Sequence, residues 1–192
     1  MKISKRLMSI LCLLSFSVPL LVLTSCQRLY YRLGTEDIEW IDSEKEFIDE
    51  FFMGMVDLDK VKLHQAGWDE YEGNSFEVGN DIYFSNDFIY VQNPLAHRST
   101  LVHEILHVLQ YQAYGFYSFP RSDYYYSLTP EKHLKEYGIE EQAQIIQDYY
   151  RWTNMDNMQF CLYALGCEEI GLEMTKEIAT RRYTEILDYT KD

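Results

Sequence analysis

The segment His103-Glu104-Ile105-Leu106-His107 constrains this chain more than any other feature of its sequence. On an α-helix, residues four apart lie on one face, a turn above each other, so the two imidazoles can bind a single ion. Two histidines at this spacing with a glutamate between them are typical of a Zn²⁺ site at which the carboxylate handles a water molecule. Chance predicts roughly 0.01 occurrences of this pattern in a chain of this composition.

The surrounding residues predict an amphipathic helix from Arg98 to Tyr114, which Gly115 ends. At about 100° per residue, one arc of the helix is apolar except for Gln112, and comprises Leu101, Val102, Ile105, Leu106, Val108, Leu109 and Ala113. The opposite arc holds His103, Glu104, His107, Gln110, Tyr111 and Tyr114. The histidines are therefore expected to face away from the apolar core. A pair of hydrogen-bonded core histidines and a solvated helix face are the alternatives.

A catalytic zinc ion usually has three protein ligands and one open position, so a third ligand is needed from elsewhere in the chain. The candidates are the carboxylates of Glu140 and Glu141 and the imidazole of His133. We favour Glu140, because Ala143 follows it by about one helical turn and would let its helix approach the first one closely. Glu141 would point about 100° away, so only one of the two glutamates can face the metal.

Two segments, 101–112 and 138–146, resemble the zincin-type metallopeptidase domains, and most of all small bacterial versions, some of which are attached to Rhs and Vgr secretion proteins. The resemblance covers about residues 60–150 and includes a strand over 79–84 before the motif. It implies that His103, His107 and Glu140 are metal ligands and that Glu104 is the general base. Gln144 stands where an acid often follows in such families, so that position supplies no carboxylate to orient a ligand.

The expected function is that of a zinc-dependent hydrolase, in particular a metallopeptidase acting on a peptide or protein. Zinc lowers the pKa of a bound water to about 7, and Glu104 would take its proton and deliver it to the leaving amine. A second donor to the oxyanion is usual, but the sequence does not choose among Tyr111, Tyr114, the tyrosines at 124–126 and His133. A strand over 82–84 would accept an extended peptide if it lay at a sheet edge. The alternative is a non-catalytic zinc-binding lipoprotein that acts as a scaffold or binding module, although such a site needs no base.

The N-terminus predicts export and lipid anchoring. Lys2, Lys5 and Arg6 precede an apolar run over 7–23, which is typical of a secretory signal. The run ends in Leu23-Thr24-Ser25-Cys26, which resembles the bacterial lipobox, so we expect residues 1–25 to be a lipoprotein signal peptide and Cys26 to carry lipid. An uncleaved anchor helix is the alternative. The expected location is the bacterial cell envelope, outside the cytoplasm, and at the outer membrane where one exists.

The charge of the chain narrows the choice of partners. The sequence has 17 Lys+Arg against 31 Asp+Glu, a formal net charge of −14. Such an acidic chain is a poor ligand for nucleic acid, whose phosphates need a positive surface. Charge would not hold it on an anionic membrane either, so the lipid must do so. Cys161 and Cys167 are expected to be buried small hydrophobes or a disulfide, and the sequence leaves that open.

The elements read from the sequence give an α+β fold, mainly helical, with one zincin-like domain over 37–192 after a tether over 26–36. A small antiparallel sheet or hairpin, formed by 81–84 and 88–91 and ended by Pro94, is expected before the motif helix. The other predicted helices are one or two within 38–63 with a break at Gly54, a short one opened by Thr129-Pro130-Glu131 and closed by Gly138, and those over 139–152, 155–165 and 168–189.

Overall fold

The computed structural model describes residues 35–66, 75–84, 94–115, 123–154, 164–165 and 171–190. It is a mixed α+β fold with a small four-stranded sheet, as the sequence predicts in outline. The signal peptide, Cys26, Cys161, Cys167 and the predicted strand over 88–91 lie outside the described residues. Within the described residues, no helix is both long and apolar enough to span a membrane.

The sheet is mixed rather than antiparallel, which corrects the prediction. Its order is β1-β2-β4-β3, with β1 at Thr35–Ile38, β2 at Lys62–Ala66, β3 at Phe76–Val78 and β4 at Asp81–Phe84. The pair β2–β4 is parallel, and the two outer pairs are antiparallel. Short strands on either side of turn residues predict a hairpin. They do not predict that β2 pairs with β4 in parallel, because the alternation of side chains along a strand does not tell which strand lies beside it. β4 is therefore an inner strand, so residues 82–84 do not form an edge of this sheet, whose edge strands are β1 and β3.

The hairpin that does form joins β3 to β4 through a two-residue turn at Gly79 and Asn80. Gly79 has φ of 75°, a left-handed conformation that a side chain disfavours and that suits a tight turn between twisted strands. Two other predicted boundaries also shift. Thr35 and Glu36 belong to β1 rather than to a tether, and Leu63 belongs to β2 rather than to a helix.

The first helix within the described residues, α3, spans Asp42–Phe51, so only part of the predicted 38–63 segment is helical. The chain leaves the helical conformation where Met53 and Gly54 adopt positive φ values. The motif helix, α4, spans Pro94–Tyr114 and begins four residues earlier than predicted, because Pro94 opens the helix instead of only ending the preceding segment. A proline is well tolerated in a first helical turn, where its missing N–H costs nothing.

The described residues from 134 onward are mainly helical, with three differences from the prediction. The 3₁₀-helix η1 spans Leu134–Glu136, and its N-cap is His133 in a capping box with Glu136, not Thr129. Helix α5 spans Ile139–Asn154, as predicted to within two residues. Helix α7 spans Leu172–Thr184 and continues as the 3₁₀-helix η2 at Glu185–Thr190. At the end of the predicted 155–165 helix, Ala164 instead forms a parallel bridge with Tyr126.

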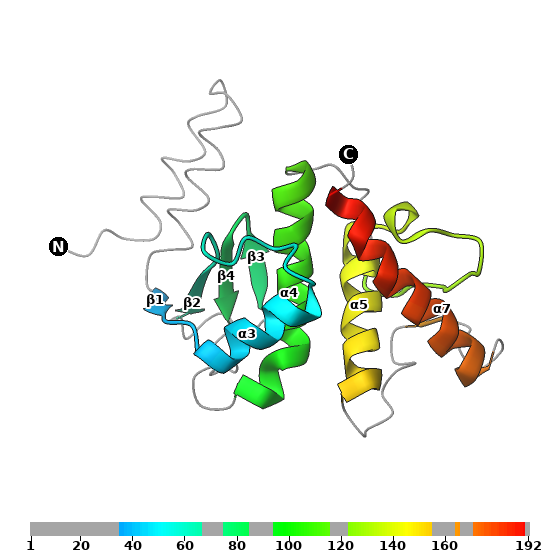
Figure 1. The fold of residues 1–192 in the computed structure, drawn as a ribbon, viewed down its shortest axis with the longest axis horizontal. Helices are drawn as coiled ribbons and strands as arrows, with labels where there is room; N and C mark the ends of the chain where they lie inside the picture. The colour runs from blue at the N-terminus through cyan, green and yellow to red at the C-terminus, as the bar shows by residue number, and fades with distance from the viewer. Residues whose placement is uncertain are drawn as a thin grey trace, which may run out of the picture.

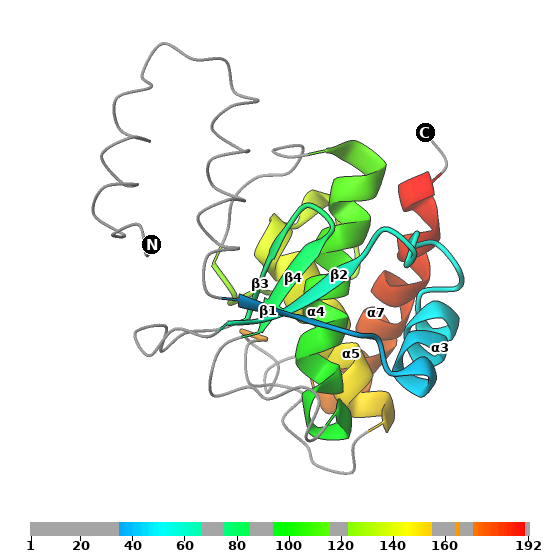
Figure 2. The same cartoon turned by 90° about the vertical axis from the view of Figure 1, so that its left-hand side faces the viewer.

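These elements form successive layers, in the order sheet, α4, α5 and α7 (Figures 1 and 2). The apolar arc of α4 is buried in the main core except for the partly buried Ala113, and it packs there with Ile82 and Phe84 of the sheet and Ala143, Ile145 and Ile146 of α5. Most of the polar arc of α4 is also buried, with His103, Glu104, His107 and Gln110 each at most 8% exposed, whereas Tyr111 and Tyr114 are partly exposed. Helix α4 is thus covered on both faces, and its polar groups need partners from α5 and its surroundings.

Candidate metal centre

Helices α4 and α5 bring together two histidines and one glutamate from the candidate ligand set. Glu140 Oε2 lies 3.2 Å from His107 Nε2 and 3.4 Å from His103 Nε2. The two imidazole Nε2 atoms are 3.2 Å apart. One ligand atom from each residue can be chosen so that all three lie within 4.8 Å of one another, which makes this set a possible metal-binding triad. Two nitrogens and one carboxylate oxygen that converge on one point suit a tetrahedral cation with one position left open.

Local sequence explains why Glu140 rather than Glu141 joins the histidines. Glu141 turns back and accepts a hydrogen bond of 2.6 Å from the backbone N–H of Gly138, at the N-terminus of α5. A glutamate three residues into a helix often satisfies a free N–H in this way. Glu140, one residue earlier, points from the same turn toward α4. Ala143 is fully buried on α5, consistent with the close approach of the two helices that its small side chain predicts.

Without a bound ion, the pKa values of the three triad residues show that their donor atoms need a positive charge between them. Burial alone would lower the pKa of His107, but its hydrogen bond to Glu140 and the charges of nearby glutamates raise this pKa to about 9. Burial would raise the pKa of Glu140, and its contacts with the two histidines bring it well below its usual range instead. For His103, burial dominates and lowers the pKa. A proton therefore sits among the donor atoms at neutral pH, where a metal cation would supply the positive charge instead.

Glu104, the predicted general base, lies on α4 beside the triad and is 4% exposed. Its pKa is raised to about 8, chiefly by burial and also by the charges of Glu140 and of Glu77 on β3, against the opposing charge of His107. Glu77 pairs with Ile82 across the β3–β4 hairpin, so it lies on the face of the sheet that packs toward α4. A divalent cation next to Glu104 would favour its ionised form, which is the form that a base needs.

The candidates for the oxyanion donor lie in different surroundings. Tyr111 lines a hollow at the C-terminal end of α4. The ring of Tyr124 lies 5.9 Å from that of His103, measured between centroids. Tyr126 is buried and its hydroxyl donates to Asp148 Oδ2 over 2.8 Å, while burial raises its pKa well above the usual value. Tyr114 packs edge-on against Tyr189, near the C-terminus of the described chain. Tyr124 is thus the tyrosine that the described contacts place against a candidate ligand.

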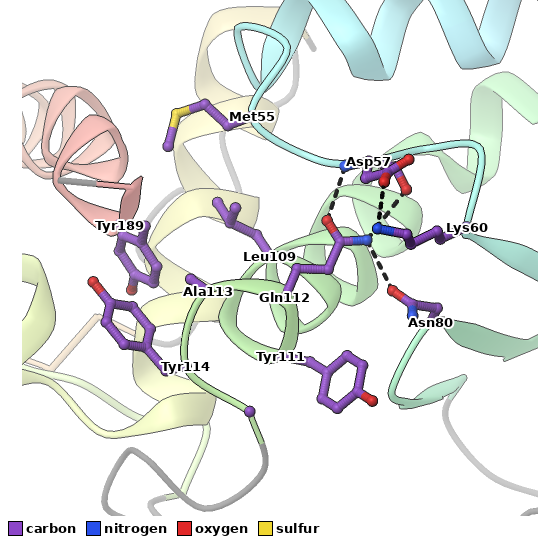
Figure 3. Close-up of a pocket in the computed structure, with 11 residues that line it drawn as sticks. Met55, Asp57, Lys60, Asn80, Leu109, Tyr111, Gln112, Ala113, Tyr114 and Tyr189 are labelled. Atoms are coloured by element: carbon purple, nitrogen blue, oxygen red, sulfur yellow. Dashed lines mark hydrogen bonds and ion pairs between the residues drawn. The ribbon is translucent and has the colours of Figure 1, made fainter. Parts of the chain in front are cut away.

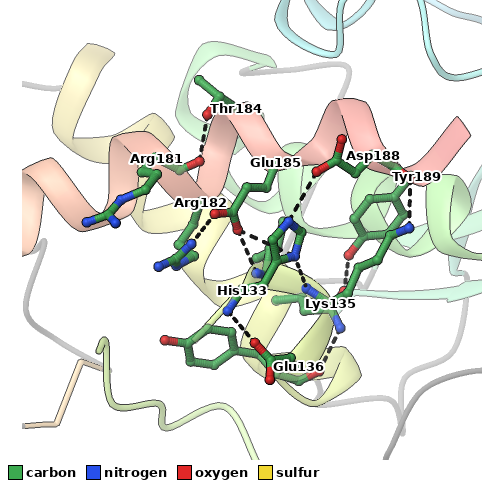
Figure 4. A network of polar contacts seen from close by, with 12 residues as sticks. His133, Lys135, Glu136, Arg181, Arg182, Thr184, Glu185, Asp188 and Tyr189 are labelled. Carbon is green, nitrogen blue, oxygen red and sulfur yellow. Dashed lines mark hydrogen bonds and ion pairs between the residues drawn. The ribbon is translucent and has the colours of Figure 1, made fainter. Parts of the chain in front are cut away.

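His133, an alternative third ligand, belongs to a different cluster (Figure 4). Its Nε2 lies 3.1 Å from Asp188 Oδ2, and its Nδ1 lies 3.6 Å from Glu185 Oε2. Glu185 also accepts hydrogen bonds from the backbone N–H of Leu134 and from Arg182. The cluster holds η1, which directly precedes α5, against η2. His133 therefore helps to position the C-terminal segment and is not part of the triad.

A hollow of about 930 Å³ opens beside the C-terminal end of α4 and is lined by residues such as Leu109, Tyr114 and Tyr189 (Figure 3). Its described lining contains none of the three triad residues.

Gln112, the polar residue in the apolar arc of α4, makes hydrogen bonds to residues outside the helix. Its amide accepts from the backbone N–H of Asp57 over 2.8 Å and donates to the Asp57 carbonyl and to Asn80 Oδ1. Gln112 therefore ties α4 to two loops of the sheet layer.

The sequence analysis did not identify the residues that support the triad through hydrogen bonds on the far side of the His107 ring. Gln110 Oε1 lies 2.8 Å from His107 Nδ1, and Gln110 Nε2 donates to Gln142 Oε1 over 2.9 Å. A signal for Gln110 was present, because it lies three residues after His107 on the same arc of the helix. Nothing in the local sequence points to the third member, Tyr189, whose hydroxyl donates to Gln142 Oε1 from 47 residues away.

Comparison with known proteins adds one relative. The chain is 28% identical over 120 residues to the Type VI secretion system spike protein VgrG2b of Pseudomonas aeruginosa. The match spans 54% of this chain and 12% of that protein. No family model and no solved structure matches the chain. The relative fits the resemblance to domains attached to Vgr secretion proteins, and this weak similarity is what the comparisons establish about the chain.

Proposed function

We propose that this protein is a zinc-dependent hydrolase with a zincin-like fold, and specifically a metallopeptidase. The observation that carries the proposal is the convergence of His103, His107 and Glu140 with the buried carboxylate of Glu104 beside them. A purely structural site would gain nothing from a fourth, unligated acid, because burying a carboxylate is costly unless it is used.

The donor set favours zinc over the other common divalent cations. Ca²⁺ and Mg²⁺ take six or more oxygen ligands, whereas the triad offers two imidazole nitrogens and one carboxylate. Three such ligands in a buried site match the hydrolytic zinc centres, which keep a position for water or substrate. Bound there, zinc would supply Lewis acidity toward a carbonyl oxygen and a water of lowered pKa.

The chain's own residues would perform the remaining steps. Glu104 accepts a proton from the attacking water and then donates it to the leaving amine, since its burial keeps the proton from escaping to solvent. Tyr124, whose ring lies against His103, donates a hydrogen bond to the oxyanion that forms at the carbonyl. An extended peptide pairs with the edge strand β3, which contacts α4.

The proposal also includes the location of the enzyme. The signal-like segment over 1–25 and Cys26 support a lipid-anchored protein of the cell envelope that cleaves peptides outside the cytoplasm. The similarity to a secretion-system spike protein supports a bacterial domain that works away from the cytoplasm. The acidic chain favours neutral or basic substrates over acidic ones.

A two-step experiment tests the proposal. The chain without residues 1–25 is purified, stripped with a chelator and reloaded with Zn²⁺, and the bound metal is measured by elemental analysis. We expect about one zinc ion per chain. A mixed peptide library is then incubated with the stripped and reloaded forms, and new termini are identified by mass spectrometry. Cleavage only by the reloaded form supports the proposal, whereas a chain that binds no zinc contradicts it. Zinc binding without cleavage favours the scaffold.

A further inference from the structure

A directional chain of hydrogen bonds runs from the backbone of η1 to the candidate ligand His107. It begins at the carbonyl oxygen of Tyr137, which can only accept a hydrogen bond. Gln142 Nε2 donates to that oxygen over 2.6 Å, so the other end of the amide, Oε1, must face away from it. Gln142 Oε1 then accepts from Gln110 Nε2 over 2.9 Å and from the Tyr189 hydroxyl.

The orientation of the second amide follows from the first. Gln110 Nε2 faces two acceptors, Gln142 Oε1 and the carbonyl oxygen of Ile139, the latter at 3.4 Å. Gln110 Oε1 is therefore the atom that lies 2.8 Å from His107 Nδ1, and an amide oxygen can only accept. His107 must carry a proton on Nδ1, so Nε2, which faces Glu140 and His103, is the nitrogen that gives up its proton and offers its lone pair when a metal ion binds. A metal ligand needs this tautomer.

We infer that Gln110 is a positioning residue that holds His107 in the tautomer and ring orientation for metal binding, with Gln142 and Tyr189 fixing the orientation of its amide. The inference rests on the proposed metal centre. All three side chains are at most 2% exposed, so solvent does not replace a lost partner without a rearrangement. The second ligand has weaker support, because the buried Nδ1 of His103 has no partner at hydrogen-bond geometry among the described residues, although the side chain of Gln147 acts on the pKa of this ring.

The same contacts tie the C-terminal segment to the metal centre. Tyr189 lies in η2, and η2 is held to η1 by the contacts of His133 and Glu185 described above (Figure 4). The segment at which the chain of hydrogen bonds begins and Tyr189, which donates to its middle member Gln142, are therefore fixed to each other. Residues far apart in the sequence thus support one ligand of the proposed zinc ion.

The test compares three variants with the wild-type chain. Gln110→Met keeps the volume of the side chain but removes the acceptor, and Gln110→Glu restores an acceptor for the Nδ1–H group. Gln112→Met is the matched control, because Gln112 is an amide on the same helix that binds only loop residues. Zinc affinity is measured by competition with a chromogenic chelator, melting temperature by calorimetry, and imidazole protonation by ¹⁵N NMR.

We expect Gln110→Met to weaken zinc binding by about 10- to 100-fold, which is the usual cost of losing an outer partner of a ligand. Gln110→Glu should retain most of the wild-type affinity. Gln112→Met should lower the melting temperature while leaving zinc affinity unchanged. Equal affinity of Gln110→Met and the wild type would overturn the inference. So would equal losses in Gln110→Met and Gln112→Met, or in Gln110→Met and Gln110→Glu.

The metal-free protein separates failure of this inference from failure of the proposed function. At a pH that makes the His107 ring neutral, the wild-type Nδ1 nitrogen should show the ¹⁵N shift of a protonated nitrogen. In Gln110→Met, that shift should move toward the value of an unprotonated nitrogen. A wild-type chain that shows the Nδ1–H form but binds no zinc contradicts only the proposed function. An unprotonated Nδ1 in the wild type overturns the inference, whatever the metal result.

Discussion

Glu140 Oε2 and His107 Nε2 lie 3.2 Å apart, although 33 residues separate them in the chain. The contact joins the first turn of α5 to the middle of α4, across the most closely packed pair of helices in the described structure. Two imidazoles and a carboxylate at this spacing repel one another unless a proton or a metal cation lies between them. The relationship therefore ties the packing of the two helices to the charge state of the triad.

The two adjacent glutamates of α5 test the ligand assignment directly. Glu140→Ala should reduce the zinc content of the reloaded protein sharply, because two remaining histidines cannot close the site. Glu141→Ala removes a hydrogen bond to the Gly138 N–H and should cost about 1 kcal/mol of stability. Elemental analysis and chemical denaturation measure the two effects. Loss of zinc from the Glu141 variant but not from the Glu140 variant would reverse the assignment.

A bidentate ion pair fixes α3 to the N-terminal half of α4. Arg98 donates from Nε and Nη2 to the two carboxylate oxygens of Glu44 over 2.7 and 2.6 Å, and Glu44 is almost fully buried. Arg98→Met leaves that carboxylate unpaired and should lower the free energy of unfolding by about 3 kcal/mol. The double variant Glu44→Leu/Arg98→Met should recover most of the loss. Urea denaturation measures both, and additive losses would contradict the coupling.

Asp148 on α5 gives a pH-dependent contribution to stability. Burial raises its pKa to about 6 from the ordinary aspartate value of 3.8, despite hydrogen bonds from Tyr126, Gln144 and Arg151. Between these two pH values the folded chain binds more protons than the unfolded chain, so the free energy of unfolding falls as pH rises from about 4 to about 6. Subtracting the stability profile of Asp148→Asn from that of the wild type isolates this slope. A flat difference would show that the carboxyl group does not titrate as proposed.

Tyr124 and Tyr125 form a matched pair for the proposed oxyanion donor. Tyr124 lies against His103, whereas Tyr125 is the next residue and is 57% exposed. Tyr124→Phe should lower kcat by about 100-fold with little change in KM, because the hydrogen bond forms mainly in the transition state. Tyr125→Phe should leave kcat near the wild-type value. Steady-state kinetics on one cleaved peptide measure kcat and KM for both variants. Similar kcat values for the two variants would remove Tyr124 from the mechanism.

The sequence predicts best those parts of the structure that depend on a local pattern of residues. The apolar arc of α4 and the start of α5 at Ile139 follow from helical periodicity, as does the choice of Glu140 over Glu141 for the face toward α4. The pairing of β2 with β4 and the position of Tyr189 beside Gln142 depend on contacts between distant segments, and no local pattern encodes them. Burial of the polar arc of α4 was also missed, because a helical wheel shows one helix and not the helix that covers it.

The most direct test of the account replaces Glu104 by glutamine, which preserves shape and hydrogen bonding but cannot act as the base. Zinc content and melting temperature of Glu104→Gln should stay close to those of the wild type, since Glu104 is not one of the three triad residues. Hydrolysis of a peptide cleaved by the zinc-loaded wild type should fall by about 100-fold or more. Equal rates of hydrolysis by the two zinc-loaded proteins would contradict the proposed mechanism.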